Sequence, residues 1–191
     1  MMHRRAALAA FVAALATGAV SCTPAGTNSG GTSDVTTTVA GSDAAGLTPA
    51  QRAAGWRPLF DGSTTAGWRG YRSQTVPAGW RVEGGTLTKD GPIGDLITTN
   101  QYGDFELAFD WKIAPGGNAG VFYRGTEEYD HIYWSAPEYQ LLDDAAHEDG
   151  RNRLTSTGAN YGLHAAPAGA LKPAGQWNST LIVVQGNRVQ H

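Results

Sequence analysis

Hydrophobic and polar positions alternate most regularly between Phe105 and Ile113. Large apolar residues occupy every second position of this segment, and Glu106, Asp110 and Lys112 fall between them. Because successive side chains of a strand point to opposite faces, this period of two predicts a strand with one buried and one polar face.

Short aromatic and β-branched runs, separated by Gly, Pro, Asn and Asp, continue from Gly55 to the end of the chain. Trp80–Lys89 is expected to form a hairpin, since Gly84 and Gly85 supply the positive φ angles that a two-residue turn needs. A second such turn is expected at 186–187. Further strands are expected at 96–99, 120–124, 139–143 and 177–185. No stretch alternates strands with long helical patterns, so the pattern predicts an all-β sandwich or barrel.

The N-terminal segment differs from this pattern. Arg4 and Arg5 precede an uncharged apolar run from Ala6 to Val20, and small residues lead into Cys22. A basic start, a short apolar run and a small-residue cleavage site are typical of a secretory signal. The run is shorter than the roughly 20 residues of a spanning helix, so we predict an export signal over 1–21.

Cys22 is the only cysteine of the chain. Its place after small residues resembles a bacterial lipobox, although Ala19 stands where such boxes usually have Leu. We predict that Cys22 carries a lipid, which would hold the protein at the outer face of the cell membrane or in the periplasm. Ordinary cleavage near Cys22, with secretion of an unlipidated protein, is the alternative. Without further cysteines no disulfide can form, so stability must come from a packed core.

Residues 22–46 are rich in Thr, Ser, Gly and Ala and contain almost no large apolar side chain. Such a composition predicts a flexible tether between the lipidated cysteine and a domain spanning 47–191. A short helix is expected at 47–54, with Thr48 as its N-cap and Pro49 at its first position. The chain stops at His191, just after a hairpin turn, so we expect the domain to be incomplete at its C-terminus.

The formal net charge of -3 gives no reason to expect nucleic acid as a partner. The chain has no phosphate-binding glycine loop and no dinucleotide fingerprint, so no nucleotide cofactor is expected. It also lacks the Gly-x-Ser-x-Gly elbow of many hydrolases and the paired cysteines or histidines of a zinc site.

Polar residues recur on strand faces. Glu138 and Gln140 are two apart and therefore share a face, Asp110 and Lys112 lie opposite an apolar stripe, and Arg124 ends a strand. A sheet with one face on the core would present these groups together on its other face. An ordinary solvated face is the alternative interpretation for each residue taken alone.

The loops contribute further candidates. Trp134 suits a sugar cleft, which needs flat aromatic surfaces beside polar groups, but it could equally fill the core. His147 lies in an acidic stretch and is a candidate general base, or a metal ligand together with Asp143; a surface position is the alternative. Tyr161 is a candidate lining residue of a pocket or a support beneath a loop.

Several motifs follow one another in order from Gly55 to His191: Leu59–Gly62, Gly67–Trp68, Phe105–Lys112, Gly117–Arg124, Pro137–Asp143 with His147, Gly158–Leu163, Gly175–Asn178 and Gly186–Val189. As a set they resemble the 3-keto-disaccharide hydrolase domain family, formerly a domain of unknown function. The resemblance implies a concanavalin-like jelly-roll β-sandwich of two antiparallel sheets with a concave, sugar-facing side.

The resemblance also implies carbohydrate substrates, namely glycosides already oxidised to a ketone at carbon 3. A ketone there acidifies the hydrogen on carbon 2. A base can remove that proton, the group on carbon 1 can then be eliminated, and water can add to the enone. Such chemistry needs a base and a positive group near the enolate oxygen.

Candidates for the base are, in order, Glu138, His147 and Asp110. Arg124 is the first candidate for the positive group, with Lys112 or a bound divalent metal ion as alternatives. Gln140, Trp134 and Tyr161 would bind the sugar. A non-catalytic carbohydrate-binding module is the alternative function, and the many ionisable groups favour an enzyme over it. The fold does not decide between them, because jelly rolls host both lectins and hydrolases.

Overall fold

The structure is a computed structural model that describes residues 4–7, 46–91, 93–169 and 171–191. The predicted lipidation site Cys22 and nearly all of the predicted tether lie outside the described residues. Within them, no helix is long and apolar enough to cross a bilayer.

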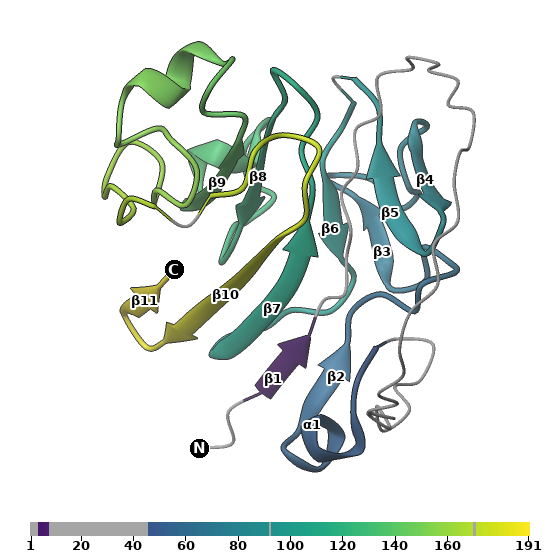
Figure 1. The fold of residues 1–191 in the computed structure, drawn as a ribbon. Coiled ribbons are helices and arrows are strands. Elements are labelled where there is room, and N and C mark those ends of the chain that lie inside the picture. Colours follow the sequence, from purple (N-terminus) through teal and green to yellow (C-terminus); the bar gives the residue numbers. More distant parts are fainter. Residues whose placement is uncertain (1–3, 8–45, 92, 170) are drawn as a thin grey trace, which may run out of the picture.

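The largest sheet has five strands in the order β11-β10-β7-β1-β2 (Figure 1). Their bounds are β1 Arg4–Ala7, β2 Trp56–Pro58, β7 Phe105–Trp111, β10 Asn178–Gln185 and β11 Arg188–Gln190. β7 pairs with β10 antiparallel along its whole length. β1, which comprises residues of the predicted export signal, pairs in parallel with both β7 and β2.

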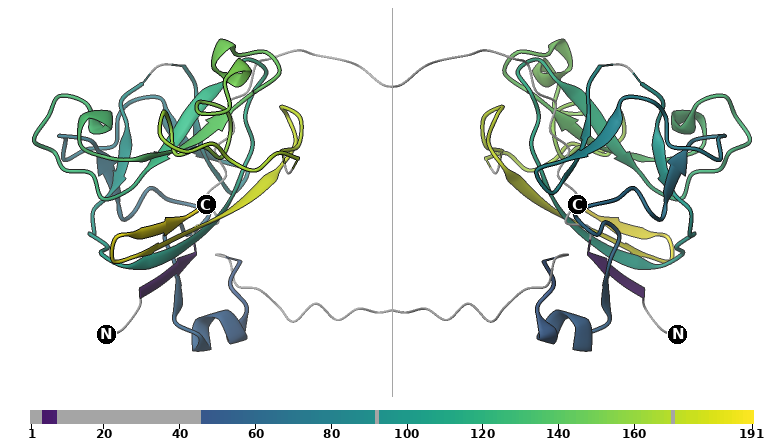
Figure 2. Two further views of the ribbon diagram at one scale, coloured as in Figure 1. Left: turned by 90° about the vertical axis from the view of Figure 1, so that its left-hand side faces the viewer. Right: turned by 90° about the vertical axis from the view of Figure 1, so that its right-hand side faces the viewer.

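The other described strands form three antiparallel pairs. They are β3 Trp68–Gly70 with β6 Leu96–Thr98, β4 Trp80–Glu83 with β5 Thr86–Lys89, and β8 Asn118–Phe122 with β9 Glu138–Leu142. The side views show the five-stranded sheet curving beneath these pairs (Figure 2). The helical elements are short: α1 Pro49–Ala53, η1 Ile132–Trp134 and η2 Glu148–Arg151.

The predicted all-β class is confirmed. The Gly84-Gly85 hairpin forms with both glycines at positive φ, 56° and 77°. Helix α1 starts as expected, and the Thr48 side chain accepts a hydrogen bond from the Gln51 backbone while the Gln51 side chain reaches back to the Thr48 N–H. This reciprocal capping satisfies two otherwise unpaired donors.

Strands β6 and β10 are each one residue shorter than predicted, ending at Thr98 and beginning at Asn178, and β8 and β9 are shifted toward the N-terminus. β8 begins at Asn118, where pairing with Leu142 starts, and it ends at Phe122. The predicted end, Arg124, has a φ of 57°, in the left-handed region that a strand does not use. β9 begins at Glu138, one residue earlier than predicted, because Glu138 pairs with Phe122.

The core lies between the five-stranded sheet and the strand pairs. Along β7 every odd-numbered residue from Phe105 to Trp111 is buried, as the alternation predicts. From the other layer Tyr139 and Leu141 of β9 join the same cluster, and the Tyr139 ring meets Phe109 edge to face at 6.1 Å. β9 therefore turns its odd-numbered residues inward and its even-numbered residues outward.

Trp111 is expected to be a main anchor of this core. It is 2% exposed, and its indole N–H donates to Thr180 Oγ1 at 2.9 Å. Trp111→Phe should lower the free energy of unfolding by about 1–3 kcal/mol, because it leaves a void and removes the hydrogen bond. Trp134→Phe, at a 67% exposed position, should change it by less than about 0.5 kcal/mol. Urea unfolding of both variants tests this, and equal losses would contradict it.

Candidate functional site

The candidate site lies on the outward face of the β8–β9 pair. Because Tyr139 and Leu141 point into the core, Glu138 and Gln140 point away from it. On β8, Gly120 lies directly opposite Gln140. The two strands thus place a carboxyl and an amide side by side over a glycine.

A lobe formed by residues 143–168 extends this surface from the free edge of β9 (Figure 1). Three backbone hydrogen bonds dock it: Gln140 N–H to Ala159 O at 3.1 Å, Gly158 N–H to Gln140 O at 2.9 Å, and Tyr161 N–H to Glu138 O at 3.0 Å. This docking places residues of the lobe, which follow β9 in the sequence, beside the outward face of β9.

Glu138 has the most strongly altered environment of the site. Its carboxyl lies over Gly120, where an added Cβ would fall 2.6 Å from Glu138 Cδ. Burial raises the pKa of Glu138 from 4.5 to about 7, and the negative charges of Asp95 and Asp149 add to this shift. A carboxyl with a pKa near neutrality can both take up and release a proton under physiological conditions.

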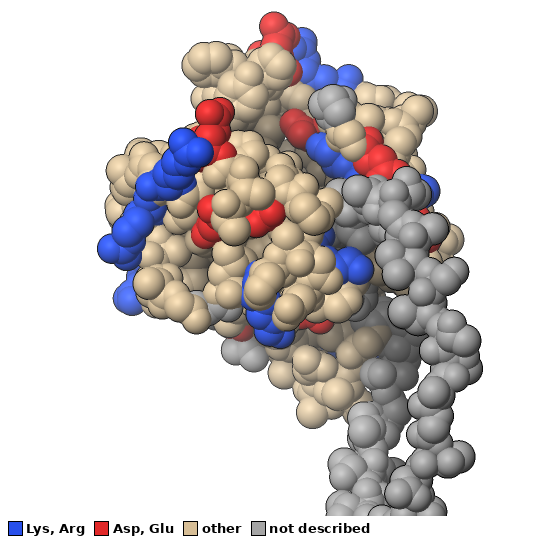
Figure 3. Space-filling model, turned by 45° about the horizontal axis from the view of Figure 1, so that its top comes forward, with Lys and Arg blue, Asp and Glu red and all other residues tan. Residues whose placement is uncertain are grey.

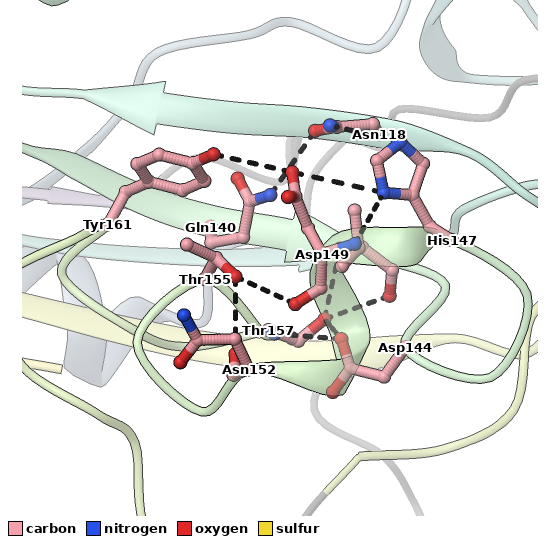
Figure 4. Close-up of polar contacts among 10 residues, drawn as sticks. Asn118, Gln140, Asp144, His147, Asp149, Asn152, Thr155, Thr157 and Tyr161 are labelled. Carbon is pink, nitrogen blue, oxygen red and sulfur yellow. Dashed lines mark hydrogen bonds and ion pairs between the residues drawn. The ribbon is translucent and has the colours of Figure 1, made fainter.

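The lobe supplies a polar cluster beside Gln140 and Asn118 of the β8–β9 pair (Figure 4). The Asp149 carboxylate lies between two partners, the Tyr161 hydroxyl at 3.3 Å and His147 Nδ1 at 3.9 Å. His147 also reaches the side chain of Asn118 on β8, with 3.5 Å between His147 Nε2 and the amide. Gln140 Nε2 in turn donates a hydrogen bond to Asn118 Oδ1 at 3.3 Å.

Three sequence-predicted residues are therefore brought together with Glu138: Gln140, His147 and Tyr161. Gln140 is only 1% exposed, and its side-chain oxygen Oε1 is enclosed without a hydrogen-bond partner. Tyr161 is 39% exposed, and burial together with the charge of Asp149 raises the pKa of its hydroxyl.

Asp143 takes a different place. Its carboxylate accepts hydrogen bonds from the backbone N–H groups of Gly116 and Ala145, at 2.8 and 3.2 Å. His147 Nδ1 is likewise engaged, by the backbone N–H of Asp149 at 3.2 Å. In the part of the chain that the structure describes, no group of three or more His, Cys, Asp or Glu side chains is arranged to hold a metal ion. The Asp143 carboxylate and His147 Nδ1 are thus both engaged by backbone N–H groups of the loop.

Arg124 is directed away from Glu138. Its guanidinium forms an ion pair with Asp104 at 2.9 Å and donates to the carbonyl oxygen of Gly186. Asp104 also accepts from the Gly186 N–H at 2.9 Å. These contacts join the β10–β11 turn to the start of β7, so this cation holds strands together in the structure.

Asp110 and Lys112 lie on the outer face of the five-stranded sheet, on the opposite side of the core from Glu138. Asp110 accepts a hydrogen bond from Ser179 on the neighbouring strand at 2.5 Å, and the Lys112 ammonium lies 4.9 Å from the ring centre of Trp177. The expected common polar face is thus divided between two layers, because β7 and β9 belong to different layers and turn their polar sides in opposite directions.

Comparison with known proteins identifies the family. Residues 55–191 match the family described as the 3-keto-alpha-glucoside-1,2-lyase-like domain. The chain belongs to this family.

Two relatives support the same family. A protein of Bacteroides thetaiotaomicron named 3-keto-disaccharide hydrolase is 37% identical over 121 residues, which cover 56% of this chain and 42% of that protein. The chain thus spans less than half the length of this curated relative. The crystal structure of a candidate glycosyl hydrolase from Parabacteroides distasonis superposes with a TM-score of 0.70 and 32% identity, covering 75% of this chain and 70% of that one.

Trp134 of this lyase-like domain is on the loop of residues 125–137, which leads into Glu138. Tyr133 stacks on His131 at 4.9 Å with an interplanar angle of 8°, and Trp134 leans on Tyr133. Arg69 holds the loop through two hydrogen bonds to Glu127, at 2.8 and 2.6 Å. Trp134 therefore does not fill the core, and it forms an exposed aromatic surface on a braced loop.

Figure 3 shows a run of basic side chains along the left edge of the face turned toward the viewer, with groups of acidic side chains beside it.

Sequence reasoning passed over three residues of the lyase-like site: Asn118, Gly120 and Asp149. The alternation along 118–122 could have placed Asn118 and Gly120 on one face, opposite Ala119 and Val121. Asp149 was part of the acidic stretch around His147, but its direction toward Tyr161 depends on the docking of the lobe.

The raised pKa of Glu138 predicts a pH-dependent stability. The folded protein holds this proton more tightly than the unfolded chain, so the contribution is fully present below about pH 4.5 and is lost as the pH rises through about 7. Relative to Glu138→Gln, the wild type should lose about 1–3 kcal/mol of unfolding free energy across this window; the range is reduced because the carboxyl is only partly buried. Urea unfolding of both proteins below about pH 4.5 and above about pH 7 measures this loss. A difference between the two proteins that does not change with pH would contradict the prediction.

Proposed function

We propose that this domain cleaves the glycosidic bond of 3-keto-glycosides, with Glu138 as the base that removes the proton on carbon 2. The observation that supports this role is the Glu138 carboxyl, which has a pKa near 7 and fills the space that a side chain at Gly120 would take. Membership of the lyase-like family and the name of the Bacteroides relative favour the same substrate class.

The proposed reaction has three steps. Glu138 takes the proton from carbon 2, and the electron pair of that bond moves toward the carbon 3 ketone, whose oxygen gains negative charge. The pair then forms a double bond between carbons 1 and 2, and the group on carbon 1 leaves with its bonding electrons and takes up the proton that Glu138 removed. Water adds across the enone, hydroxide at carbon 1 and a proton at carbon 2, which completes a net hydrolysis.

The ketone is essential in this scheme, because it makes the hydrogen on carbon 2 acidic. The protein should therefore cleave a 3-keto-disaccharide and leave the unoxidised parent intact. Chromatography of both mixtures measures this, and a substrate deuterated at carbon 2 should react more slowly. Equal cleavage of both sugars would contradict the proposal and indicate an ordinary glycosidase.

A non-catalytic carbohydrate-binding module is the second candidate. The observation that favours it is the exposed aromatic surface of His131, Tyr133 and Trp134, since sugar-binding modules commonly use such rings. Binding of both sugars in calorimetry, without cleavage of either, would support this candidate and exclude the first.

We further propose that the protein is exported and held at the membrane through a lipid on Cys22. The basic start, the apolar run and the Ser/Thr/Gly-rich segment support this proposal. Cys22→Ser should move the protein from the detergent-soluble membrane fraction to the soluble fraction. Mass spectrometry of the N-terminal peptide checks for the acyl groups; a wild type without them would favour the secreted alternative.

A further inference from the structure

The loop of residues 125–137 connects β8 to β9 and ends directly at the proposed base. Phe122, the last residue of β8, pairs with Glu138, the first residue of β9. Just beyond this pair, the Tyr123 N–H donates to the carbonyl oxygen of Pro137 at 3.3 Å. Trp134 precedes Glu138 by four residues, and four residues of chain span at most about 14 Å. The exposed rings of the loop are therefore close to Glu138.

The interior of the loop is closed by its own residues. Ile132 is only 6% exposed, and it packs so closely on Gly125 that an added Cβ there would collide with it. Ser135 Oγ ties the two arms of the loop together, since it accepts from the Thr126 N–H and donates to the Thr126 carbonyl oxygen, both at 3.0 Å. With Ile132 turned inward, its neighbours His131 and Tyr133 are exposed, as is Trp134.

The segment after β3 braces the same loop from outside. The Tyr71 hydroxyl lies 2.9 and 2.8 Å from the carbonyl oxygens of Thr126 and Tyr129, and the Arg72 backbone N–H donates to Glu127 Oε1 at 2.6 Å. Arg72 has a φ of 52°, which is costly for a residue with a side chain and is found most often at functional sites. Several strong contacts thus fix a loop whose aromatic rings themselves remain exposed.

Asp95 connects this brace with Glu138. The Tyr71 backbone N–H donates to the Asp95 carbonyl oxygen at 2.9 Å. Burial raises the pKa of Glu138, and the charge of Asp95 adds to that shift. Burial likewise raises the pKa of Tyr71, and Asp95 is among the charges that add to it. Because such effects fall with distance, the braced loop and the Glu138 carboxyl belong to the same end of the molecule.

We propose that His131, Tyr133 and Trp134 form a subsite for the leaving group of the substrate, in which the sugar attached to carbon 1 of the 3-keto ring stacks on these aromatic rings. The proposal rests on the proposed function, because it says where the second sugar of that substrate binds. A pyranose ring carries its hydroxyl groups on the rim, and its C–H face fits the negative face of an aromatic ring.

The two borders of Glu138 match the two halves of such a substrate. Along the edge of β9, the lobe offers polar side chains such as Asp149 and Tyr161, which suit the hydroxyl groups of the reacting ring. At the start of β9, the loop offers flat rings, and the leaving sugar needs only a surface to lie on. Rings on a braced loop lose little freedom on binding, so contacts with the remote sugar can help to hold the scissile bond at Glu138.

Kinetics with two leaving groups test the subsite. Trp134→Ala should lower kcat/KM for a 3-keto-disaccharide about 10- to 50-fold, and for a methyl 3-keto-glycoside, which lacks the second sugar, by less than about 2-fold. Trp134→Phe should recover most of the loss, since it keeps a flat ring. Leu181→Ala, at an outward position of β10 that is 47% exposed, is the control and should match the wild type. Equal losses on both substrates, or no loss on either, would overturn the proposal.

A binding measurement separates this proposal from the proposed function. ¹H–¹⁵N spectra of the wild-type protein follow the indole N–H of Trp134, identified by its loss in Trp134→Phe, during titration with the unoxidised disaccharide and with the methyl glycoside. Only the disaccharide should shift this signal. An unmoved signal in a protein that cleaves the 3-keto-disaccharide would overturn the subsite and leave the proposed function standing. A shifted signal without any cleavage of 3-keto sugars would support the subsite and remove the proposed function.

Discussion

Glu138→Gln is expected to lower kcat/KM for a 3-keto-disaccharide by about 10²- to 10⁴-fold, the range typical of a lost general base. Glutamine has nearly the same shape, but it cannot accept a proton from carbon 2. The side chain forms no hydrogen bond or ion pair in the described part of the protein, so the substitution should not disturb a network. Steady-state kinetics of both proteins measure the loss.

The pH profile of the wild type gives an independent check of the same residue. A base must be deprotonated, so kcat/KM should rise with pH and level off above about 7, the pKa of Glu138. Glu128→Gln, at an exposed position of the neighbouring loop, should keep both the rate and the profile. Full turnover in Glu138→Gln would exclude this residue as the base and return His147 to consideration.

Gly120→Ala is expected to lower kcat about 10²-fold while changing stability little. The added Cβ would fall 2.6 Å from Glu138 Cδ and well inside van der Waals contact with Glu138 Oε1. The carboxyl is the end of a flexible side chain and can move aside, so the fold should tolerate the change. A displacement of about 1 Å of a reacting group is enough for such a loss of rate.

Gly103→Ala is the matched control, because an added Cβ there has no atom within 4 Å. Neither glycine has a positive φ, so alanine is compatible with both backbones. Kinetics and urea unfolding of the two variants should differ only in kcat. If Gly120→Ala kept full activity, the position of Glu138 over Gly120 would not be the reactive one.

Local pattern was enough to predict many elements of the fold. The alternation along Phe105–Trp111 predicted both the strand and its buried face, and Gly84-Gly85 predicted a hairpin that forms as expected. These signals are short-range, because side-chain period and turn conformation depend on neighbouring residues. The same parity placed Glu138 and Gln140 on one face, and the structure directs both outward from the core.

The local pattern could not predict to which layer of the fold each strand belongs, or on which side of the core its polar face lies. Asp110 and Glu138 both occupy polar positions of amphipathic strands, yet they lie on opposite sides of the core because β7 and β9 belong to different layers. Arg124 was a reasonable candidate cation, but its partner Asp104 comes from the start of another strand. Such pairings depend on contacts between distant segments, which no window of sequence contains.

The sequence by itself determined the all-β class, the inward and outward parity of each strand and the set of motifs that identifies the family. Only the tertiary structure decided that Glu138 is buried beside Asp95 and Asp149, and that the lobe brings His147 to Asn118. The physical reason is that parity follows from the geometry of one strand, whereas the pKa of a carboxyl and the direction of an amide depend on groups that folding brings from elsewhere in the chain.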